Sequence, residues 1–369
     1  MSARRAQDEL LLSGFQPRAA LRTRVTPVAM PAWPVVSSHE HLGPVFGGDW
    51  SRRPVHELLS TMDAVGILAM VDLDGGQGDG LSRQVERYQA PHRSRVSVFA
   101  GLDYGMWRSE PAFGDVEAAR LRDSVARGAR GLKVWKHLGL VARDPAGRLV
   151  GVDDTRLDPL WRTAGALGLP VIIHVGDPLA FFRPLDGSNE RWEELHAHPD
   201  WHFWPPRESP DGPGYPGFDE ILGGLDRLIG RHPGTTFVGA HVGCAAEDLA
   251  LVSAMLERHP NYHVDIAARV AELGRQPYTT RRFFLRWHDR ILFGTDSAVD
   301  PETCRIYYRF LETSDESFDY SCDPLPPQGR WQIHGLGLPQ EVLREVYADN
   351  ARRVLGMDGG GPARSGTTP

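Results

Sequence analysis

Two histidines separated by one residue, His39 and His41, are the side chains of this sequence best suited to chemistry. They follow a short apolar run at residues 34–36 that is typical of a strand entering a protein interior. Successive side chains of a strand point to opposite faces, so His39 and His41 share one face and Glu40 takes the other. Two imidazoles at the end of a buried strand can bind one metal ion, which requires further ligands from elsewhere in the chain.

Three later apolar runs end in side chains that would complete such a site. His174 ends the run at residues 171–174, His241 follows the run at residues 236–240, and Asp296 follows the run at residues 291–295. A single histidine of this kind would most often be a satisfied core residue. Their recurrence at the ends of separate runs predicts a shared pocket, where the carboxyl ends of parallel strands meet.

Lys133 lies inside another apolar run, at residues 131–135. Burying a lysine is unfavourable unless its amine is paired or chemically modified. Reaction with carbon dioxide would convert the amine into a carbamate, an anionic oxygen ligand able to bridge two metal ions. The alternative is a structural lysine paired with a carboxylate in the mouth of the fold.

Arg269 follows the run at residues 262–266, where its guanidinium can bind a substrate carboxylate with two hydrogen bonds. The alternative is a salt bridge to Glu272 or to a carboxylate of a covering loop. His137, which closely follows Lys133, is placed to reach a substrate. The other histidines, in helices and loops, are interpreted as surface or loop residues and not as ligands. His263 lies at the start of its run, the end opposite to the predicted site.

The elements that must position these residues alternate between strand and helix. Apolar β-rich runs occur at residues 35–38, 66–71, 96–102, 131–135, 171–174, 236–240, 262–266 and 291–295. Helical segments occur at residues 56–65, 116–127, 158–167, 219–231, 246–258, 279–288 and 339–355. Near-continuous apolar strands that alternate with helices predict an α/β fold. Polar residues at the carboxyl ends of the strands favour a closed (β/α)8 TIM barrel over an open sheet.

Two connections are long and rich in aromatic residues: residues 177–217, after the fifth strand, and residues 297–332, after the eighth. Loops of this length in compact domains often cover a site, and these would roof the carboxyl face of the barrel. The same aromatic residues would equally serve a dimer contact, and we expect a homodimer. We divide the chain into an N-terminal arm (1–33), a metal-dependent barrel (34–357) and a disordered tail (358–369).

The net charge of the 369-residue chain is −7 and its pI is about 6.1, which argues against nucleic-acid or anionic-membrane partners. No apolar stretch approaches the roughly 20 residues that span a bilayer, and no signal-peptide pattern opens the chain. The three cysteines lack CxxC spacing. We therefore expect a soluble cytoplasmic protein that acts on a small molecule.

With the HxH triplet at residues 39–41, His174, His241 and the FGTD sequence at residues 293–296, the chain resembles the amidohydrolase superfamily of metal-dependent barrel enzymes. The resemblance covers residues 34–355. It is greatest to the amidohydrolase-related branch, which includes aminocarboxymuconate semialdehyde decarboxylase, γ-resorcylate decarboxylase and the dicarboxylate lactonases. Many relatives have aspartate where this chain has Ser37, and the HEH triplet also resembles the phosphotriesterase-like lactonases.

By this resemblance, His39, His41, His174 and Asp296 match metal-ligand positions. His241 matches a second-metal ligand in binuclear members and a catalytic histidine in mononuclear ones. Lys133, within GLKVWKHLG, stands where urease-like members carry a carboxylated lysine. The resemblance implies one or two divalent ions, with Zn²⁺ expected and Mn²⁺, Fe²⁺ or Co²⁺ suited to the same ligands. A binding protein with a vestigial site would lack an expected ligand, and none is missing from this sequence.

The predicted function is metal-dependent hydrolysis of an amide, lactone or ester bond in a small carboxylated or cyclic substrate. A divalent ion held by imidazoles and a carboxylate lowers the pKa of bound water towards about 7. Asp296 would act as general base, His241 or the ion would polarise the carbonyl, and Arg269 would hold the substrate. The alternative is decarboxylation of an aromatic or unsaturated carboxylic acid, in which Asp296 or His241 protonates carbon.

Overall fold

The structure is a computed structural model that describes residues 10–44, 50–206 and 214–357 of the chain. Within these residues, eight parallel β-strands occupy the centre, one for each predicted apolar run. They are β1 (Val35–Glu40), β2 (Ile67–Asp72), β3 (Val96–Val98), β4 (Leu132–Val134), β5 (Val171–Ile173), β6 (Phe237–Gly239), β7 (Tyr262–Asp265) and β8 (Ile291–Leu292). Nearly all their residues are buried, as expected for parallel strands covered on both faces.

The strands close into a ring. Hydrogen bonds order them as two sheets, β1-β2-β3 and β4-β5-β6-β7-β8. Ala100 pairs with Leu132 between β3 and β4, and Glu40 pairs with Ser297 between β1 and the loop after β8. At this second junction the His41 amide donates to the Ser297 carbonyl at 2.8 Å. These contacts join both pairs of sheet edges, and the fold is the predicted TIM barrel.

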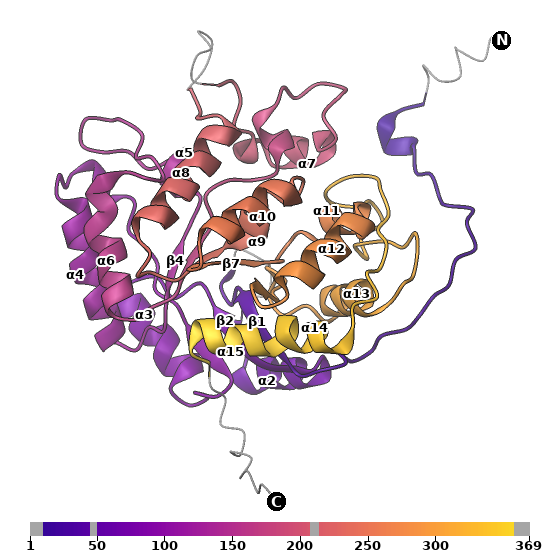
Figure 1. Cartoon of the computed structure of the whole chain (residues 1–369), viewed down its shortest axis with the longest axis horizontal. Helices are drawn as coiled ribbons and strands as arrows, with labels where there is room; N and C mark the ends of the chain where they lie inside the picture. Colours follow the sequence, from indigo (N-terminus) through magenta and orange to yellow (C-terminus); the bar gives the residue numbers. More distant parts are fainter. Residues whose placement is uncertain (1–9, 45–49, 207–213, 358–369) are drawn as a thin grey trace, which may run out of the picture.

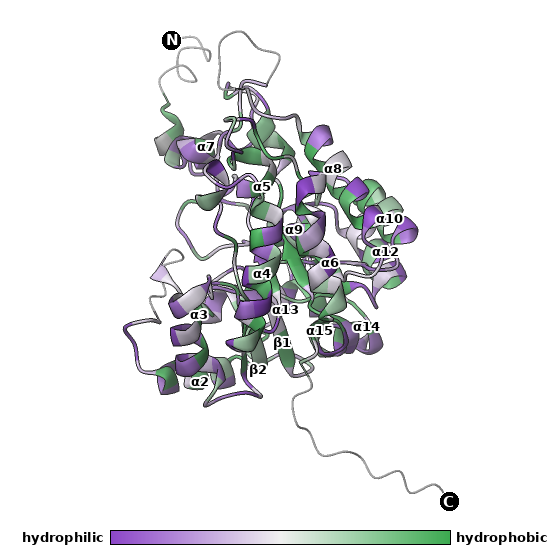
Figure 2. Ribbon diagram, turned by 90° about the vertical axis from the view of Figure 1, so that its left-hand side faces the viewer, coloured by the Kyte–Doolittle hydropathy of each residue, from purple (hydrophilic) through white to green (hydrophobic). Residues whose placement is uncertain are grey.

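Helices cover the outside of the ring (Figure 1). The main ones are α2 (Val55–Ala64), α3 (Gly78–Gln84), α4 (Phe113–Ala126), α6 (Asp158–Ala166), α8 (Phe218–Arg231), α10 (Leu249–Arg258), α12 (Pro277–Trp287) and α13 (Pro301–Glu312). Short elements in the connections are η1 (Leu12–Gly14), η3 (Val85–Gln89), η4 (Met106–Arg108), α5 (His137–Leu140), η5 (Thr155–Leu157), η6 (Leu179–Phe182), α7 (Trp192–Ala197), η7 (Pro199–Trp201), α9 (Ala240–Gly243) and α11 (Val270–Arg275). Figure 2 shows hydrophobic strands at the centre and hydrophilic positions on the surrounding helices.

The predicted C-terminal helix consists of α14 (Gln340–Arg344), η8 (Glu345–Asp349) and α15 (Asn350–Leu355) in direct succession. Asn350 anchors it to the barrel, because its side-chain amide donates to the carbonyls of His288 and Ile291 at 2.6 and 2.8 Å. Gly356 ends the helix with a left-handed φ of +62°, the boundary signal expected from the sequence. None of the helices in the described ranges is both long and apolar enough to span a membrane.

The connection after β8 is long and aromatic, as predicted, but its first part is the helix α13. The carboxylate of Asp300 caps this helix by accepting a hydrogen bond from the Thr303 amide at 2.7 Å. We expected Tyr307 and Tyr308 in a covering loop, whereas the structure buries both in the core against Phe293. The helical signal lies in the i, i+3, i+4, i+7 spacing of Cys304, Tyr307, Tyr308 and Leu311.

The N-terminal arm contacts the barrel near α13 and α14. The Thr26 hydroxyl donates to Asp315 at 2.8 Å, and the Ala32 amide donates to Glu312 at 2.9 Å. The Trp33 indole donates to Gln340 at 2.9 Å. Residues 1–9 of the arm and the predicted disordered tail, residues 358–369, lie outside the described residues.

His263, on β7, is expected to make the barrel sensitive to acid. Burial and the nearby charges of Arg290 and Arg353 lower the pKa of His263 from 6.5 to about 4. Between these values the unfolded chain binds a proton that the folded protein does not. The contribution of His263 to the free energy of unfolding is therefore fully present above pH 6.5. It falls as the pH drops towards 4, by about 1.4 kcal/mol per pH unit.

The variant His263→Gln should lose about 1 kcal/mol less stability than the wild type between pH 7.5 and 5.5, because the titrating group is gone. Urea unfolding at the two pH values measures the difference. Equal losses in the two proteins would contradict the prediction.

Candidate metal centre

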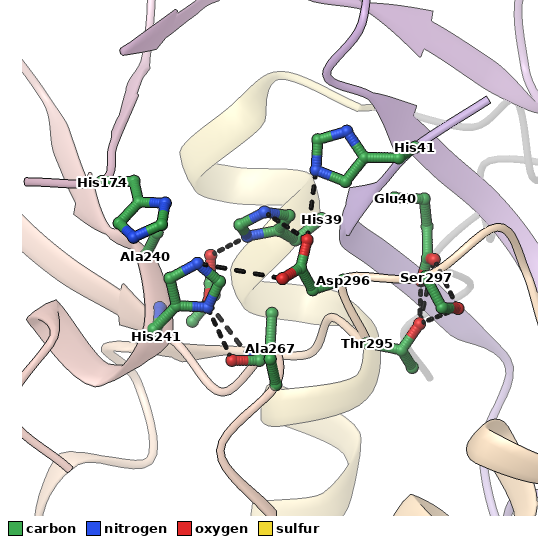
Figure 3. Close-up of polar contacts among 12 residues, drawn as sticks. His39, Glu40, His41, His174, Ala240, His241, Ala267, Thr295, Asp296 and Ser297 are labelled. Atoms are coloured by element: carbon green, nitrogen blue, oxygen red, sulfur yellow. Dashed lines mark hydrogen bonds and ion pairs between the residues drawn. The ribbon is translucent and has the colours of Figure 1, made fainter. Parts of the chain in front are cut away.

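Three histidines direct their Nε2 atoms at one aspartate in the mouth of the barrel (Figure 3). His39 lies in β1 and His41 directly follows it, whereas His241 follows β6 and Asp296 follows β8. The Nε2 atoms of His39 and His41 lie 3.3 and 3.1 Å from Asp296 Oδ1. The Nε2 atom of His241 lies 4.0 Å from Asp296 Oδ2. Glu40 points away from this group, as the alternation of a strand requires.

Oxygen atoms behind the rings fix the orientation of all three imidazoles. Each Nδ1 contacts one of them: His39 contacts Asp265 at 2.8 Å, His41 contacts Asp74 at 2.7 Å and His241 contacts the Ala267 carbonyl at 2.8 Å. An ionised carboxylate or a carbonyl only accepts hydrogen bonds, so each Nδ1 carries the proton. Each Nε2 then presents its lone pair to the centre. Metal-binding histidines are oriented in this way.

This arrangement fits a divalent cation. Lone pairs of His39 and His41 that face Asp296 Oδ1 repel it unless a positive charge lies among them. A proton on His41 can supply this positive charge. Burial lowers the pKa of His41, but hydrogen bonds to Asp296 and Asp74 outweigh burial and raise the pKa to about 9. Burial would raise the pKa of Asp296, but the charge and hydrogen bond of His39 hold it well below its usual range. Imidazoles with an ionised carboxylate are ligands of catalytic zinc sites.

The backbone at the centre is strained. His241 and Asp296 both have φ of +59°, in the left-handed region that residues other than glycine rarely adopt. Such a conformation costs on the order of 1–3 kcal/mol per residue and persists where the surrounding structure holds it. The strain therefore coincides with two of the residues predicted to do chemistry.

His174 lies beside this group but is turned differently. Its ring packs edge-on against that of His241, with 4.4 Å between the ring centres. Its Nε2 donates to the Gly176 carbonyl at 2.7 Å and lies 3.5 Å from Asp177 Oδ1. The Nδ1 atom of His174 is therefore the one left with a lone pair. Burial lowers the pKa of His174 to about 4, which keeps the ring neutral.

Lys133 is fully buried on β4, and its Nζ lies 3.2 Å from Nε2 of His39. The carboxylate partner considered for it is not found, because no described carboxylate lies within ion-pair distance of its amine. Burial lowers the pKa of Lys133, which favours the neutral, nucleophilic amine. Lys133 and Lys136 are the only lysines in a chain rich in arginine. The structure thus places one of two lysines directly against His39, a predicted metal ligand.

Arg269 does not form the salt bridge to Glu272 that we considered. Glu272 pairs with Arg191, from the connection after β5, and Arg191 also binds Glu194 at 2.8 Å. Arg269 is only 6% exposed, and its Nη1 donates to the Ala268 carbonyl at 2.8 Å. Among the described residues, no carboxylate lies within ion-pair distance of Arg269.

Asp74 and Asp265, which orient the histidines, were missed in the sequence. Asp265 is the last residue of β7, and Asp74 closely follows β2. The rule that selected the other site residues, a polar side chain at the carboxyl end of a strand, applies to both. Asp265 also accepts a hydrogen bond from the His241 amide at 2.9 Å, so one carboxylate orients His39 and fixes the backbone of His241.

A cavity of about 540 Å³ opens beside Asp296, large enough for a small substrate. Its walls come from the loops after β7 and β8, from α13 and from residues 320–328, and they include Ala268, Asp300, Tyr307, Tyr320 and Gln328. Arg269 is not part of the lining, although both its sequence neighbours are. The two long connections contact each other above the barrel, where Arg330 Nε donates to Glu193 at 2.7 Å.

Comparison with known proteins identifies the family. The sequence model described as amidohydrolase matches residues 84–357, more than half of the chain, including Lys133, His174, His241 and Asp296. The structure is similar to 2,6-dihydroxybenzoate decarboxylase from Rhizobium, with a TM-score of 0.54 and 18% identity, over 89% of this chain and 100% of that one. It is also similar to an uncharacterised TIM-barrel protein from Bordetella bronchiseptica, with a TM-score of 0.51 and 14% identity, over 88% and 98% of the chains. No curated protein matches the chain. The chain therefore belongs to the amidohydrolase family, whose sequence model matches most of its length.

Proposed function

We propose that this protein is a metal-dependent hydrolase that cleaves an amide, lactone or ester bond of a small carboxylated or cyclic substrate. The observation that carries the proposal is the contact of 3.2 Å between the amine of Lys133 and Nε2 of His39, inside a group of imidazoles around Asp296. A modified lysine at this point would add an anionic oxygen ligand and allow a second cation. Zn²⁺ is the proposed ion.

The modification requires carbon dioxide and no enzyme. The Lys133 nitrogen forms a bond to the carbon of carbon dioxide, one N–H proton is released to water, and the product is an anionic carbamate. The fully buried position of Lys133 would keep the carbamate away from bulk water, where it would hydrolyse.

Bound divalent ions supply Lewis acidity and lower the pKa of a coordinated water molecule. Asp296, at the edge of the cavity, accepts the proton of the attacking water and delivers it to the leaving group. For His241 we propose a role other than polarising the substrate carbonyl. Because its Nδ1 proton is held by the Ala267 carbonyl, neutral His241 presents an acceptor to the centre and does not donate to an oxyanion.

Arg269 is proposed to provide the positive charge for a substrate carboxylate, since its neighbours Ala268 and Val270 line the cavity and no described carboxylate lies within ion-pair distance of it. The variant Arg269→Met should raise KM by about 10- to 100-fold with a smaller effect on kcat, as expected for loss of a charged hydrogen bond worth about 1.5–3 kcal/mol. Arg281→Met, which removes an exposed arginine of α12, is the control. An unchanged KM in Arg269→Met would contradict the assignment.

Decarboxylation of an aromatic or unsaturated carboxylic acid is the second candidate, supported by the likeness to 2,6-dihydroxybenzoate decarboxylase. The test combines elemental analysis of the purified protein with two substrate panels. Turnover of lactones, esters or amides supports hydrolysis, whereas carbon dioxide release from hydroxybenzoates supports decarboxylation. Absence of bound metal and of activity in protein supplied with Zn²⁺ or Mn²⁺ would refute both.

A further inference from the structure

Glu40 is a buried carboxylate surrounded by hydroxyl groups. Its exposed fraction is 0%, and among the described residues no lysine or arginine lies within ion-pair distance of it. Three hydroxyl groups surround it instead: Ser37 at 2.6 Å, Thr295 at 2.8 and 2.9 Å, and Ser297 at 3.2 Å. Burying a carboxylate is costly, so a function for this arrangement is expected.

Two of these hydroxyls flank the metal-site aspartate. Thr295 and Ser297 are the residues on either side of Asp296, and Glu40 holds both on the side of β1 that faces away from the imidazoles (Figure 3). Glu40 itself stands between His39 and His41. The Glu40 carboxylate therefore connects two segments of three residues that carry the site, residues 39–41 and residues 295–297.

The backbones of these two segments are also joined. The Asp296 amide donates to the His39 carbonyl at 3.0 Å, and the His41 amide donates to the Ser297 carbonyl at 2.8 Å. Asp296 has the left-handed φ of +59° that only its surroundings can maintain. These bonds cross the junction where β1 and β8 close the barrel. Because β8 ends at Leu292, the loop that carries Asp296 lies beyond the regular strand and depends on such individual bonds.

We infer that Glu40 is a positioning residue, which binds the hydroxyls on both sides of Asp296 and thereby holds the Asp296 carboxylate against His39 and His41. This rests on the proposed metal centre and deepens it. Glu40 would not be a ligand of a bound ion, because its side chain lies on the opposite face of β1. Outer residues of this kind typically change metal affinity by about 10- to 100-fold.

The test compares variants that differ in which hydroxyl contact they lose. Glu40→Ala and Thr295→Val remove the contact beside Asp296, whereas Ser37→Ala removes a hydroxyl from the same carboxylate but none from the loop. Glu40→Gln keeps the shape and one acceptor oxygen. For each protein, Zn²⁺ affinity is measured by chelator competition, the visible spectrum is recorded with Co²⁺, and thermal unfolding is followed without metal.

We expect Glu40→Ala and Thr295→Val to bind Zn²⁺ about 10- to 100-fold more weakly and to show altered Co²⁺ spectra. Glu40→Gln should fall between them and the wild type, and Ser37→Ala should resemble the wild type. If Glu40→Ala does not fold, Thr295→Val decides. Folded variants with unchanged affinity and spectrum would overturn this inference alone, even with lowered thermal stability. A wild type that binds none of these metals would overturn the proposed function as well.

Discussion

Replacing Asp296 with asparagine is expected to abolish nearly all activity, with kcat lowered by about 10²- to 10⁴-fold, and to weaken metal binding. The substitution keeps the shape of the side chain but removes the charge that faces His39 and His41 at 3.3 and 3.1 Å. It also removes the proposed proton acceptor. Steady-state kinetics and elemental analysis of the same preparation measure the two effects separately.

Asp319→Asn is the matched control, because Asp319 is an exposed aspartate in the same connection after β8 and lies outside the cavity lining. It should retain wild-type kinetics and metal content. If Asp296→Asn keeps both its metal and its rate, Asp296 is neither ligand nor base and the proposed centre is wrong.

Replacing Lys133 with alanine should remove one of the proposed two ions and lower kcat/KM by about 100-fold or more, since a missing carbamate leaves the second cation without its anionic bridge. A short carboxylate such as propionate should restore part of the activity by entering the space that the side chain leaves. Lys133→Arg introduces a fixed positive charge of similar size and cannot form the carbamate, and propionate should not rescue it.

The carbamate can be observed directly because the chain has only two lysines. Protein equilibrated with ¹³C-bicarbonate should show one carbamate carbon signal by NMR. The signal should vanish in both Lys133 variants and persist in Lys136→Arg. A wild-type protein with no such signal, or with a single ion per chain, would refute the binuclear assignment and leave a mononuclear centre of histidines and Asp296.

The conformation of Arg269 illustrates the limit of local inference. Its sequence neighbour Glu272 was the obvious partner, only three residues away. In the structure Glu272 binds Arg191, which arrives from the connection after β5. The residues around Arg269 in the sequence do not reveal that Arg191, from a distant segment, competes for Glu272. Because Arg191 binds Glu272, Arg269 does not pair with it.

Helix α13 illustrates a different kind of limit. Its amphipathic spacing and its Asp300 cap were present in the sequence. The aromatic residues in the same segment suggested a cover for the site and concealed the helical period. Tyr307 and Tyr308 are buried because the helix packs them against Phe293, whose position depends on β8.

From the residues alone, the eight strands, most of the helices, the barrel and the histidines and aspartate at its mouth could be predicted. These follow from periodicity and burial, which are encoded within a few residues, and the HxH spacing alone separates His39 and His41 from Glu40. Three features depend on the folded arrangement: which nitrogen of each imidazole faces the centre, which carboxylates orient the imidazoles, and which hydroxyl groups surround Glu40. Those contacts join residues 226 positions apart for His39 and Asp265 and 255 apart for Glu40 and Thr295, so closure of the barrel creates them.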